Sequence, residues 1–159
     1  MELKTIEIDQ IFEPILSYQH IAGVIDSDGS ITISRRNFKR KRPTYTVLIQ
    51  LTWILTKPTK NYIENLVRYF GGSYFISEKI YPGRFKNAKP IIKYCATGEA
   101  AQKLLLAISP NLWLKQQQAQ NALTLLAYKK LDFRTRTQQD WDKFEYLYKS
   151  NKLLNSSKL

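Results

Sequence analysis

The stretch Ile21–Gly29, which reads IAGVIDSDG, constrains this chain most, because it leads from an apolar helix directly into two acidic residues. The segment Glu13–Ile25 predicts that helix. Pro14 suits its first position, where the missing N–H would have no partner in any case. The later part of the segment is almost wholly apolar, so we expect the helix to be buried.

Two small residues, Ala22 and Gly23, leave part of this helix almost without side chains. A glycine inside a helix costs about 1 kcal/mol relative to alanine, and the close approach of a second helix is the expected compensation. Gly29 is expected to end the helix in the left-handed conformation, which glycine adopts most readily.

Two carboxylates, Asp26 and Asp28, follow at the predicted C-terminus of the helix. That end carries partial negative charge, which disfavours acidic side chains by about 0.3–1 kcal/mol each. Acids gathered beside helix carbonyls form a hard-oxygen site, which suits magnesium or calcium. The simpler interpretation is that Asp28-Gly29 forms only a turn, as this dipeptide commonly does.

The composition favours a nucleic acid or an anionic membrane surface as partner, because 25 Lys and Arg against 13 acids give a net charge of +12 over 159 residues. No apolar run is long enough to span a membrane. The single cysteine, Cys95, excludes a disulfide framework, and with the single histidine, His20, it excludes an ordinary zinc site. Because Met1–Glu13 has no signal-peptide core, we expect an intracellular protein, in the cytoplasm or an organelle matrix or stroma, and not a secreted one.

Alternation of apolar and polar residues predicts two β-hairpins with one apolar and one polar face. The strands are expected at Ser30–Arg36, Thr44–Ile54, Ser73–Tyr81 and Pro90–Ala96, with basic connections at Asn37–Pro43 and Pro82–Lys89. Further helices are expected at Pro58–Phe70, Thr97–Ser109, Leu114–Leu131 and Gln138–Leu154. The predicted class is α+β.

A sheet with one polar face and two basic hairpin tips is suited to double-stranded DNA, since base edges are read in the major groove and phosphates position the protein. The alternative for each residue is an ordinary solvated strand face. Candidates on the polar face are Thr32, Ser34, Arg36, Thr44, Thr46, Gln50, Thr52, Phe75, Ser77, Lys79 and Tyr81. Candidates for phosphate contacts are Lys39, Arg40, Lys41, Arg42, Arg84, Lys86 and Lys89.

The nine-residue stretch resembles the LAGLIDADG motif of homing endonucleases and intron maturases. Six positions match letter for letter, and Ile21, Val24 and Ser27 are conservative replacements; the matching residues are Ala22, Gly23, Ile25, Asp26, Asp28 and Gly29. The order of elements is similar to the αββαββα core of that family. The resemblance implies a single endonuclease domain over residues 1–159, with a core at about 14–131, an antiparallel DNA-binding sheet, and a C-terminal helical extension at about 132–155.

The resemblance also implies a chemistry for the acidic residues. In the family the second acid of the motif and the preceding carbonyl bind the catalytic divalent ion, which implies Asp28 and Ser27 as ligands of Mg²⁺, with Ca²⁺ binding without supporting cleavage. Asp26 is interpreted as structural. Lys115, in the stretch Leu114–Ala119, falls where the family has a catalytic lysine, and Lys60 is the candidate for a second basic group. The family's active-site glutamine is absent, with Leu55 or Thr56 near its place.

Single-motif members of the family pair as homodimers through the motif helices, which implies an interface at Ala22 and Gly23 and a pseudo-palindromic DNA site. We therefore expect an intron-encoded, Mg²⁺-dependent endonuclease that makes double-strand breaks, with no small-molecule cofactor and no membrane partner. The main alternative is an RNA-splicing maturase or a cleavage-dead DNA-binding relative. A basic RNA- or membrane-associated structural protein is a third possibility.

Overall fold

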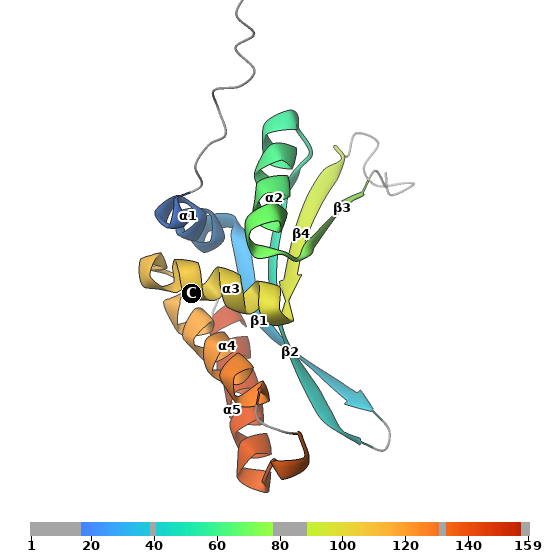
Figure 1. Ribbon diagram of the computed structural model, residues 1–159, viewed down its shortest axis with the longest axis vertical. Helices are drawn as coiled ribbons and strands as arrows, with labels where there is room; N and C mark the ends of the chain where they lie inside the picture. Colours follow the sequence, from blue (N-terminus) through green and yellow to red (C-terminus); the bar gives the residue numbers. More distant parts are fainter. Residues whose placement is uncertain (1–16, 39–40, 78–88, 131–132, 157–159) are drawn as a thin grey trace, which may run out of the picture.

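The computed structural model describes residues 17–38, 41–77, 89–130 and 133–156, and its helices and strands follow the predicted order (Figure 1). In chain order they are α1 (Tyr18–Asp28), β1 (Gly29–Phe38), β2 (Lys41–Ile54), α2 (Lys57–Phe70), β3 (Ser73–Ser77), β4 (Ile91–Thr97), α3 (Gly98–Ile108), the 3-10 turn η2 (Ser109–Asn111), α4 (Gln116–Lys129), the 3-10 turn η3 (Phe133–Thr135) and α5 (Gln138–Ser156).

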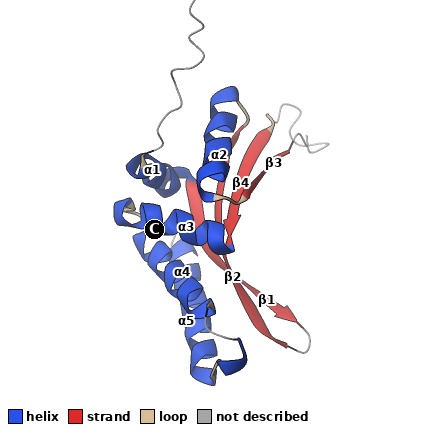
Figure 2. Ribbon diagram, in the orientation of Figure 1, coloured by secondary structure: helices blue, strands red, loops and turns tan. Residues whose placement is uncertain are grey.

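The four strands form one antiparallel sheet in the order β1-β2-β4-β3, so the two hairpins meet through β2 and β4. Figure 2 shows the helices gathered on one side of this sheet. The strand residues that face them are buried: Ile31, Ile33, Val47, Ile49, Leu51, Ile92, Tyr94 and Ala96. Each large aliphatic side chain buried in this way contributes about 1.5–3 kcal/mol. The intervening residues form the second face, which no described helix covers.

The motif helix α1 differs from its prediction at its C-terminal end. It begins after Ser17, whose hydroxyl accepts the backbone N–H of His20 at 3.1 Å, and residues 13–16 lie outside the described ranges. It runs on to Asp28, three residues beyond the predicted end. The predicted left-handed Gly29 is wrong, because this residue is extended, with φ −85° and ψ 171°.

Glycine at position 29 is required for a different reason. A Cβ there would lie 2.9 Å from both the Cα and the carbonyl oxygen of Ile25, closer than real Cβ contacts. The chain therefore passes from helix to strand without a turn, and Asp28 is joined directly to β1. This also excludes the interpretation of Asp28-Gly29 as a simple turn.

The first hairpin is longer than predicted. Asn37 and Phe38 belong to β1, and β2 begins at Lys41, so only residues 39 and 40, outside the described ranges, separate the strands. Later elements agree more closely. Thr56 begins α2 with a capping box to Thr59. α4 begins at Gln116, two residues after its predicted start at Leu114.

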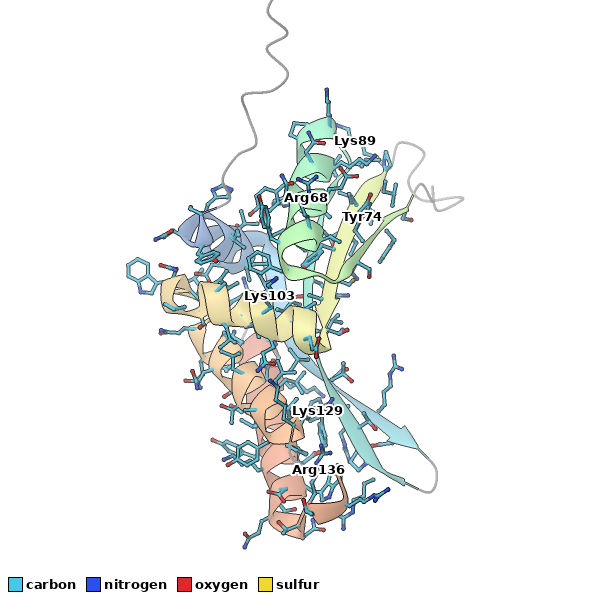
Figure 3. The ribbon with its side chains drawn as sticks, viewed as in Figure 1. Arg68, Tyr74, Lys89, Lys103, Lys129 and Arg136 are labelled. Carbon is cyan, nitrogen blue, oxygen red and sulfur yellow. The ribbon has the colours of Figure 1, made fainter. Side chains whose placement is uncertain are left out.

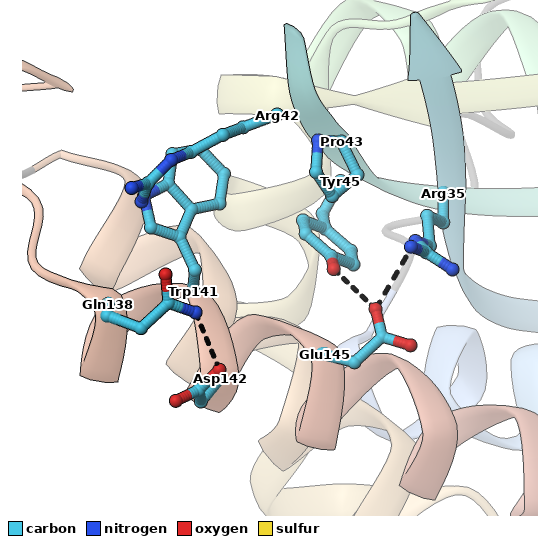
Figure 4. A pocket seen from close by; sticks show the side chains of 8 residues that line it. All are labelled: Arg35, Arg42, Pro43, Tyr45, Gln138, Trp141, Asp142 and Glu145. Atoms are coloured by element: carbon cyan, nitrogen blue, oxygen red, sulfur yellow. Dashed lines mark hydrogen bonds and ion pairs between the residues drawn. The ribbon is translucent and has the colours of Figure 1, made fainter.

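The far end of this hairpin is held by α5 through one carboxylate (Figure 4). Glu145 accepts the hydroxyl of Tyr45 at 2.5 Å and lies 3.3 Å from Nε of Arg35. Lys129 of α4, labelled in Figure 3, donates to the Tyr45 carbonyl at 2.7 Å. Burial, together with the hydrogen bond to Glu145, raises the pKa of Tyr45 to about 12, and the same bond lowers the pKa of Glu145.

We predict that Glu145→Gln, which keeps an acceptor for the Tyr45 hydroxyl but removes the charge beside Arg35, lowers the free energy of unfolding by about 1 kcal/mol at pH 7, the difference between a hydrogen bond to a charged group and one to a neutral group. Because the pKa of Glu145 is lowered in the folded state, its contribution is present above the ordinary glutamate pKa of about 4.3 and is lost as the pH falls through the lower folded value. Urea unfolding of both proteins between pH 3 and pH 7 measures this. A difference that persists unchanged at pH 3 would contradict the assignment.

Candidate active site and nucleic-acid interface

The acidic end of α1 is organised around Asp28, the last residue of the helix. Its carboxylate is exposed, and its Oδ2 accepts the indole N–H of Trp53 on β2 at 2.9 Å. Trp53 was not among the candidates from the sequence. Its position on the apolar face of β2 could be predicted, but nothing in the local sequence indicates a partner 25 residues earlier.

Asp26 points the other way and joins α1 to the segment before α4. Its Oδ2 accepts the backbone N–H of Trp113 at 2.6 Å, and its Oδ1 accepts that of Lys115 at 3.0 Å. This agrees with the structural role predicted for Asp26, although the carboxylate fixes the start of α4 and does not end α1.

Lys115 lies at the same end of α1. Its Nζ donates to the carbonyl oxygen of Ile25 at 2.9 Å and to that of Asp26. A cation at this position offsets the partial negative charge of the helix C-terminus. Burial lowers the pKa of Lys115, while the Asp26 and Asp28 carboxylates act to raise it. The structure thus brings Asp28 and Lys115 to one helix end, which is the arrangement that the resemblance implies.

The oxygen atoms at this end of α1 are of the type that a hard divalent cation binds, but the described residues of one chain supply too few of them. The Ser27 hydroxyl donates to the Val24 carbonyl at 3.2 Å, so the side chain is engaged and its carbonyl is the ligand to consider. In the described ranges there is no cluster of three or more His, Cys, Asp or Glu that could hold a metal. One carboxylate and helix carbonyls would therefore require water, phosphate or a second chain to complete a coordination shell.

Lys60 is not brought to Asp28 by any contact among the described residues. Its Nζ pairs with Glu64, one turn later on α2, at 3.7 Å, and both side chains are exposed. A different α2 residue approaches the site, since the Tyr62 ring packs against Trp53 with their centroids 5.2 Å apart.

The second face of the sheet collects the polar residues as the alternation predicted. The register pairs Thr32 with Leu48, Ser34 with Thr46, Arg36 with Thr44, Gln50 with Cys95, and both Thr52 and Phe75 with Lys93. Lys93, which lies 5.9 Å from the Phe75 ring centroid, was missed, although the alternation of β4 places it on this face. Ser77 also lies here, opposite Ile91, and Lys89 is exposed just before β4.

One basic candidate, Arg42, falls elsewhere. Arg42 is directed towards α5, with its guanidinium 5.2 Å from the Trp141 ring centroid (Figure 4). This corrects its expected place at the tip facing DNA, because the aromatic ring of α5 offers a cation–π contact. The remaining predictions lie outside the residues or side chains that the structure describes: Lys39, Arg40, Lys41, Lys79, Tyr81, Arg84 and Lys86.

The two small residues of α1 have separate surroundings. Ala22 is fully buried in the core of this chain, so its prediction as an interface residue is wrong. Gly23 is exposed, and a Cβ there would meet nothing within 4 Å. Adjacent helix residues point about 100° apart, and here the Ala22 side chain lies in the core while the Gly23 position faces outward.

No protein-family model and no curated protein matches the chain. Solved structures do match. The I-CvuI homing endonuclease, in complex with its target in the presence of calcium, shares 19% identity at a TM-score of 0.67, covering 89% of this chain and 83% of that one. The archaeal intron-encoded homing endonuclease I-Vdi141I, complexed with DNA, shares 14% identity at a TM-score of 0.67, covering 89% and 86%. The I-LtrWI LAGLIDADG homing endonuclease, bound to target DNA, shares 13% identity at 0.63, covering 89% of this chain and 46% of that chain.

The chain therefore has the LAGLIDADG homing-endonuclease fold, and the fold predicted from its motif is confirmed. The antiparallel four-stranded sheet and the helix–strand order are those expected from the sequence. Within the described ranges, no helix is both long and apolar enough to cross a bilayer.

The two acids of the motif should differ in their effect on stability. Asp26→Ala leaves two backbone N–H groups without their acceptor, and we predict a loss of about 2 kcal/mol of unfolding free energy. Asp28→Ala removes the acceptor of a single exposed bond and should cost less than about 1 kcal/mol. Thermal and urea unfolding of both variants measure the difference. Equal losses would contradict the division of roles.

Proposed function

We propose that this protein is a site-specific DNA endonuclease of the homing type. The observation that carries the proposal is the placement of Asp28 and Lys115 at one helix end, directly continuous with a strand of the polar sheet face. A nuclease of this design requires an acidic centre and a DNA-reading surface that are rigidly connected. The three solved neighbours named above were each determined with DNA or a DNA target, which supports the same substrate.

The sheet face is suited to reading base edges. Its donors and acceptors recur at every second residue, at about 6.6–6.8 Å along a strand. Ser34 and Arg36 on β1, together with Thr44 and Thr52 on β2, are exposed on this face and have hydrogen-bonding side chains that can reach outward. Lys93 adds positive charge between the two hairpins. Basic residues on such a face attract the phosphate backbone.

The chemistry proposed at Asp28 is metal-assisted phosphodiester hydrolysis. Mg²⁺, when held by Asp28 and the Ser27 carbonyl, would lower the pKa of water and neutralise charge on the scissile phosphate. Asp28 supplies a negatively charged oxygen ligand. Lys115 places its Nζ beside this site, and burial lowers its pKa against the opposing effect of the Asp26 and Asp28 carboxylates. Calcium, a larger ion with looser geometry, would bind without supporting the reaction.

The proposed assembly is a homodimer, because one chain offers one acidic centre and a double-strand break requires two. The exposed Gly23 gives α1 a surface against which another helix can approach closely. Nearby, Trp113 and Leu114 are 90% and 77% exposed, in the segment that Asp26 fixes to α1. Large exposed apolar side chains beside an exposed helix glycine indicate a protein interface. An origin inside an intron is part of this proposal, and one structural neighbour, I-Vdi141I, is intron-encoded.

The alternative is an RNA-splicing maturase or a cleavage-dead DNA-binding relative that keeps the sheet without the chemistry. In the direct test, the purified protein is incubated with Mg²⁺ and host genomic DNA that lacks the intron encoding it, and the DNA ends that form are captured and sequenced. Discrete cut sites that disappear with Asp28→Asn would support the endonuclease. Binding to DNA or RNA without any cut would favour the alternative.

Asp28→Asn should abolish cleavage and leave the affinity for uncut DNA in calcium within about tenfold, or 1.4 kcal/mol. The asparagine oxygen can still accept the Trp53 N–H, so the local structure should persist. Gel-shift titration and single-turnover cleavage separate the two effects. Loss of DNA binding or of folding would instead make Asp28 a structural residue.

Gly23→Leu should convert the dimer to a monomer, because the leucine side chain would keep the second helix from approaching α1 closely. The monomer should remain folded, because leucine is a better helix former than glycine and meets nothing within the chain. Analytical ultracentrifugation measures the mass, and circular dichroism checks the fold. Gln120→Leu, at an exposed position of α4, is the matched control and should remain dimeric. A monodisperse, active Gly23→Leu dimer would refute the proposed helix crossing.

A further inference from the structure

The indole of Trp53 connects the acidic end of α1 to the sheet. Its N–H donates to Asp28 Oδ2 at 2.9 Å. Within the described residues, Trp53 is the side chain that hydrogen-bonds to the Asp28 carboxylate. The carboxylate is exposed and sits at a helix end that disfavours negative charge, so its orientation depends on such a partner.

Three elements fix the direction of that N–H. Trp53 belongs to β2 and packs partly buried against the core. Its ring meets Tyr62 of α2 nearly edge-on, with centroids 5.2 Å apart and planes at 61°. Tyr62 in turn meets His20 of α1, at 5.7 Å and 63°. The indole is therefore held between β2 and α2 and has little freedom to turn away from Asp28.

The chemistry of this donor suits a metal ligand. An indole N–H is uncharged and only donates, so it cannot coordinate a cation or take up a proton. A lysine or arginine in its place would neutralise the carboxylate and compete with a divalent ion for it. Trp53 instead occupies one oxygen and leaves the full negative charge on the group, with Oδ1 available.

We propose that Trp53 is a positioning residue for Asp28, whose indole N–H orients the carboxylate to bind a divalent cation through its other oxygen. This inference rests on the proposed function and deepens it by giving a role to a residue outside the acidic motif. It makes Trp53, and not only the motif, a determinant of metal affinity at this site.

The decisive variant is Trp53→Phe, which keeps an aromatic ring against Tyr62 and removes the N–H. Trp141→Phe is the matched control, because Trp141 is also partly buried and packs edge-on against an aromatic ring, that of Phe144 at 5.6 Å on α5. Binding of Mn²⁺ to the metal-free full chain is followed by the electron paramagnetic resonance of free Mn²⁺, with Asp28→Asn defining the Asp28-dependent component.

We expect Trp53→Phe to weaken the Asp28-dependent binding of Mn²⁺ about tenfold, the lower end of the effect of groups that orient metal ligands. Trp141→Phe should bind Mn²⁺ like the wild type. Three outcomes would overturn the inference: wild-type affinity in a folded Trp53→Phe protein, an equal loss in both variants, or no Asp28-dependent binding in the wild type.

A second measurement covers the case in which Trp53→Phe does not fold. The chain has three tryptophans, so its ¹H–¹⁵N spectrum contains three indole N–H resonances, which the other two Trp→Phe variants assign by elimination. Asp28→Ala, which removes the acceptor, should shift the Trp53 resonance and leave that of Trp141 in place. An unchanged Trp53 resonance would show that the contact is absent and overturn the inference.

These outcomes are separable from failure of the proposed function. Trp53-dependent Mn²⁺ binding in a protein that cuts no DNA would refute the endonuclease and leave the positioning role intact. DNA cleavage with the same Mg²⁺ dependence in wild type and Trp53→Phe would refute the positioning role and leave the endonuclease intact.

Discussion

The reciprocal contact between Lys115 and Asp26 is the interaction on which the rest of this structure depends. The Lys115 backbone N–H bonds to the Asp26 carboxylate, and its ammonium group bonds to the carbonyl oxygens of Ile25 and Asp26. A helix end with unpaired carbonyls is a poor place for acidic side chains, and the partly buried Lys115 cation offsets that cost. The same contact fixes the start of α4, against which α5 packs, and α5 in turn holds the far end of the first hairpin through Glu145.

The sequence determines which face of each strand is which, because side chains alternate strictly along an extended chain. The sequence alone therefore places Thr32, Ser34 and Gln50 on the second face of the sheet, and the strand register confirms this placement. The same alternation places Lys93 there. The exposed face of a helix is harder to assign from the sequence. Ala22 and Gly23 were assigned to one surface because both are small, yet one is in the core and the other faces outward.

Contacts between distant elements could not be predicted from the pattern. Trp53 and Asp28 are 25 residues apart, and Tyr45 and Glu145 are 100 apart. Hydrophobic periodicity shows that a residue points inward or outward but does not show which polar atom it meets. Lys115 is the exception, since the resemblance to a known motif pointed to its position. For Lys60 the same kind of resemblance led to an exposed helix residue paired with Glu64.

The direct passage from α1 into β1 at Gly29 fixes the spacing between the acidic helix end and the side chains of β1. With no loop between them, the distance from Asp28 to each side chain of β1 is set by the backbone alone. At about 3.3 Å per residue, Arg36 lies eight residues, or about 26 Å of chain, beyond the acid. In the proposed endonuclease, substitutions at Ser34 or Arg36 would change which bases are preferred, but not how far the preferred bases lie from the cut. An inserted residue would shift that spacing and turn every later side chain of the strand to the opposite face. If the proposed DNA site is read by β1, sequence changes on this strand would alter the base sequence of the site while conserving its length.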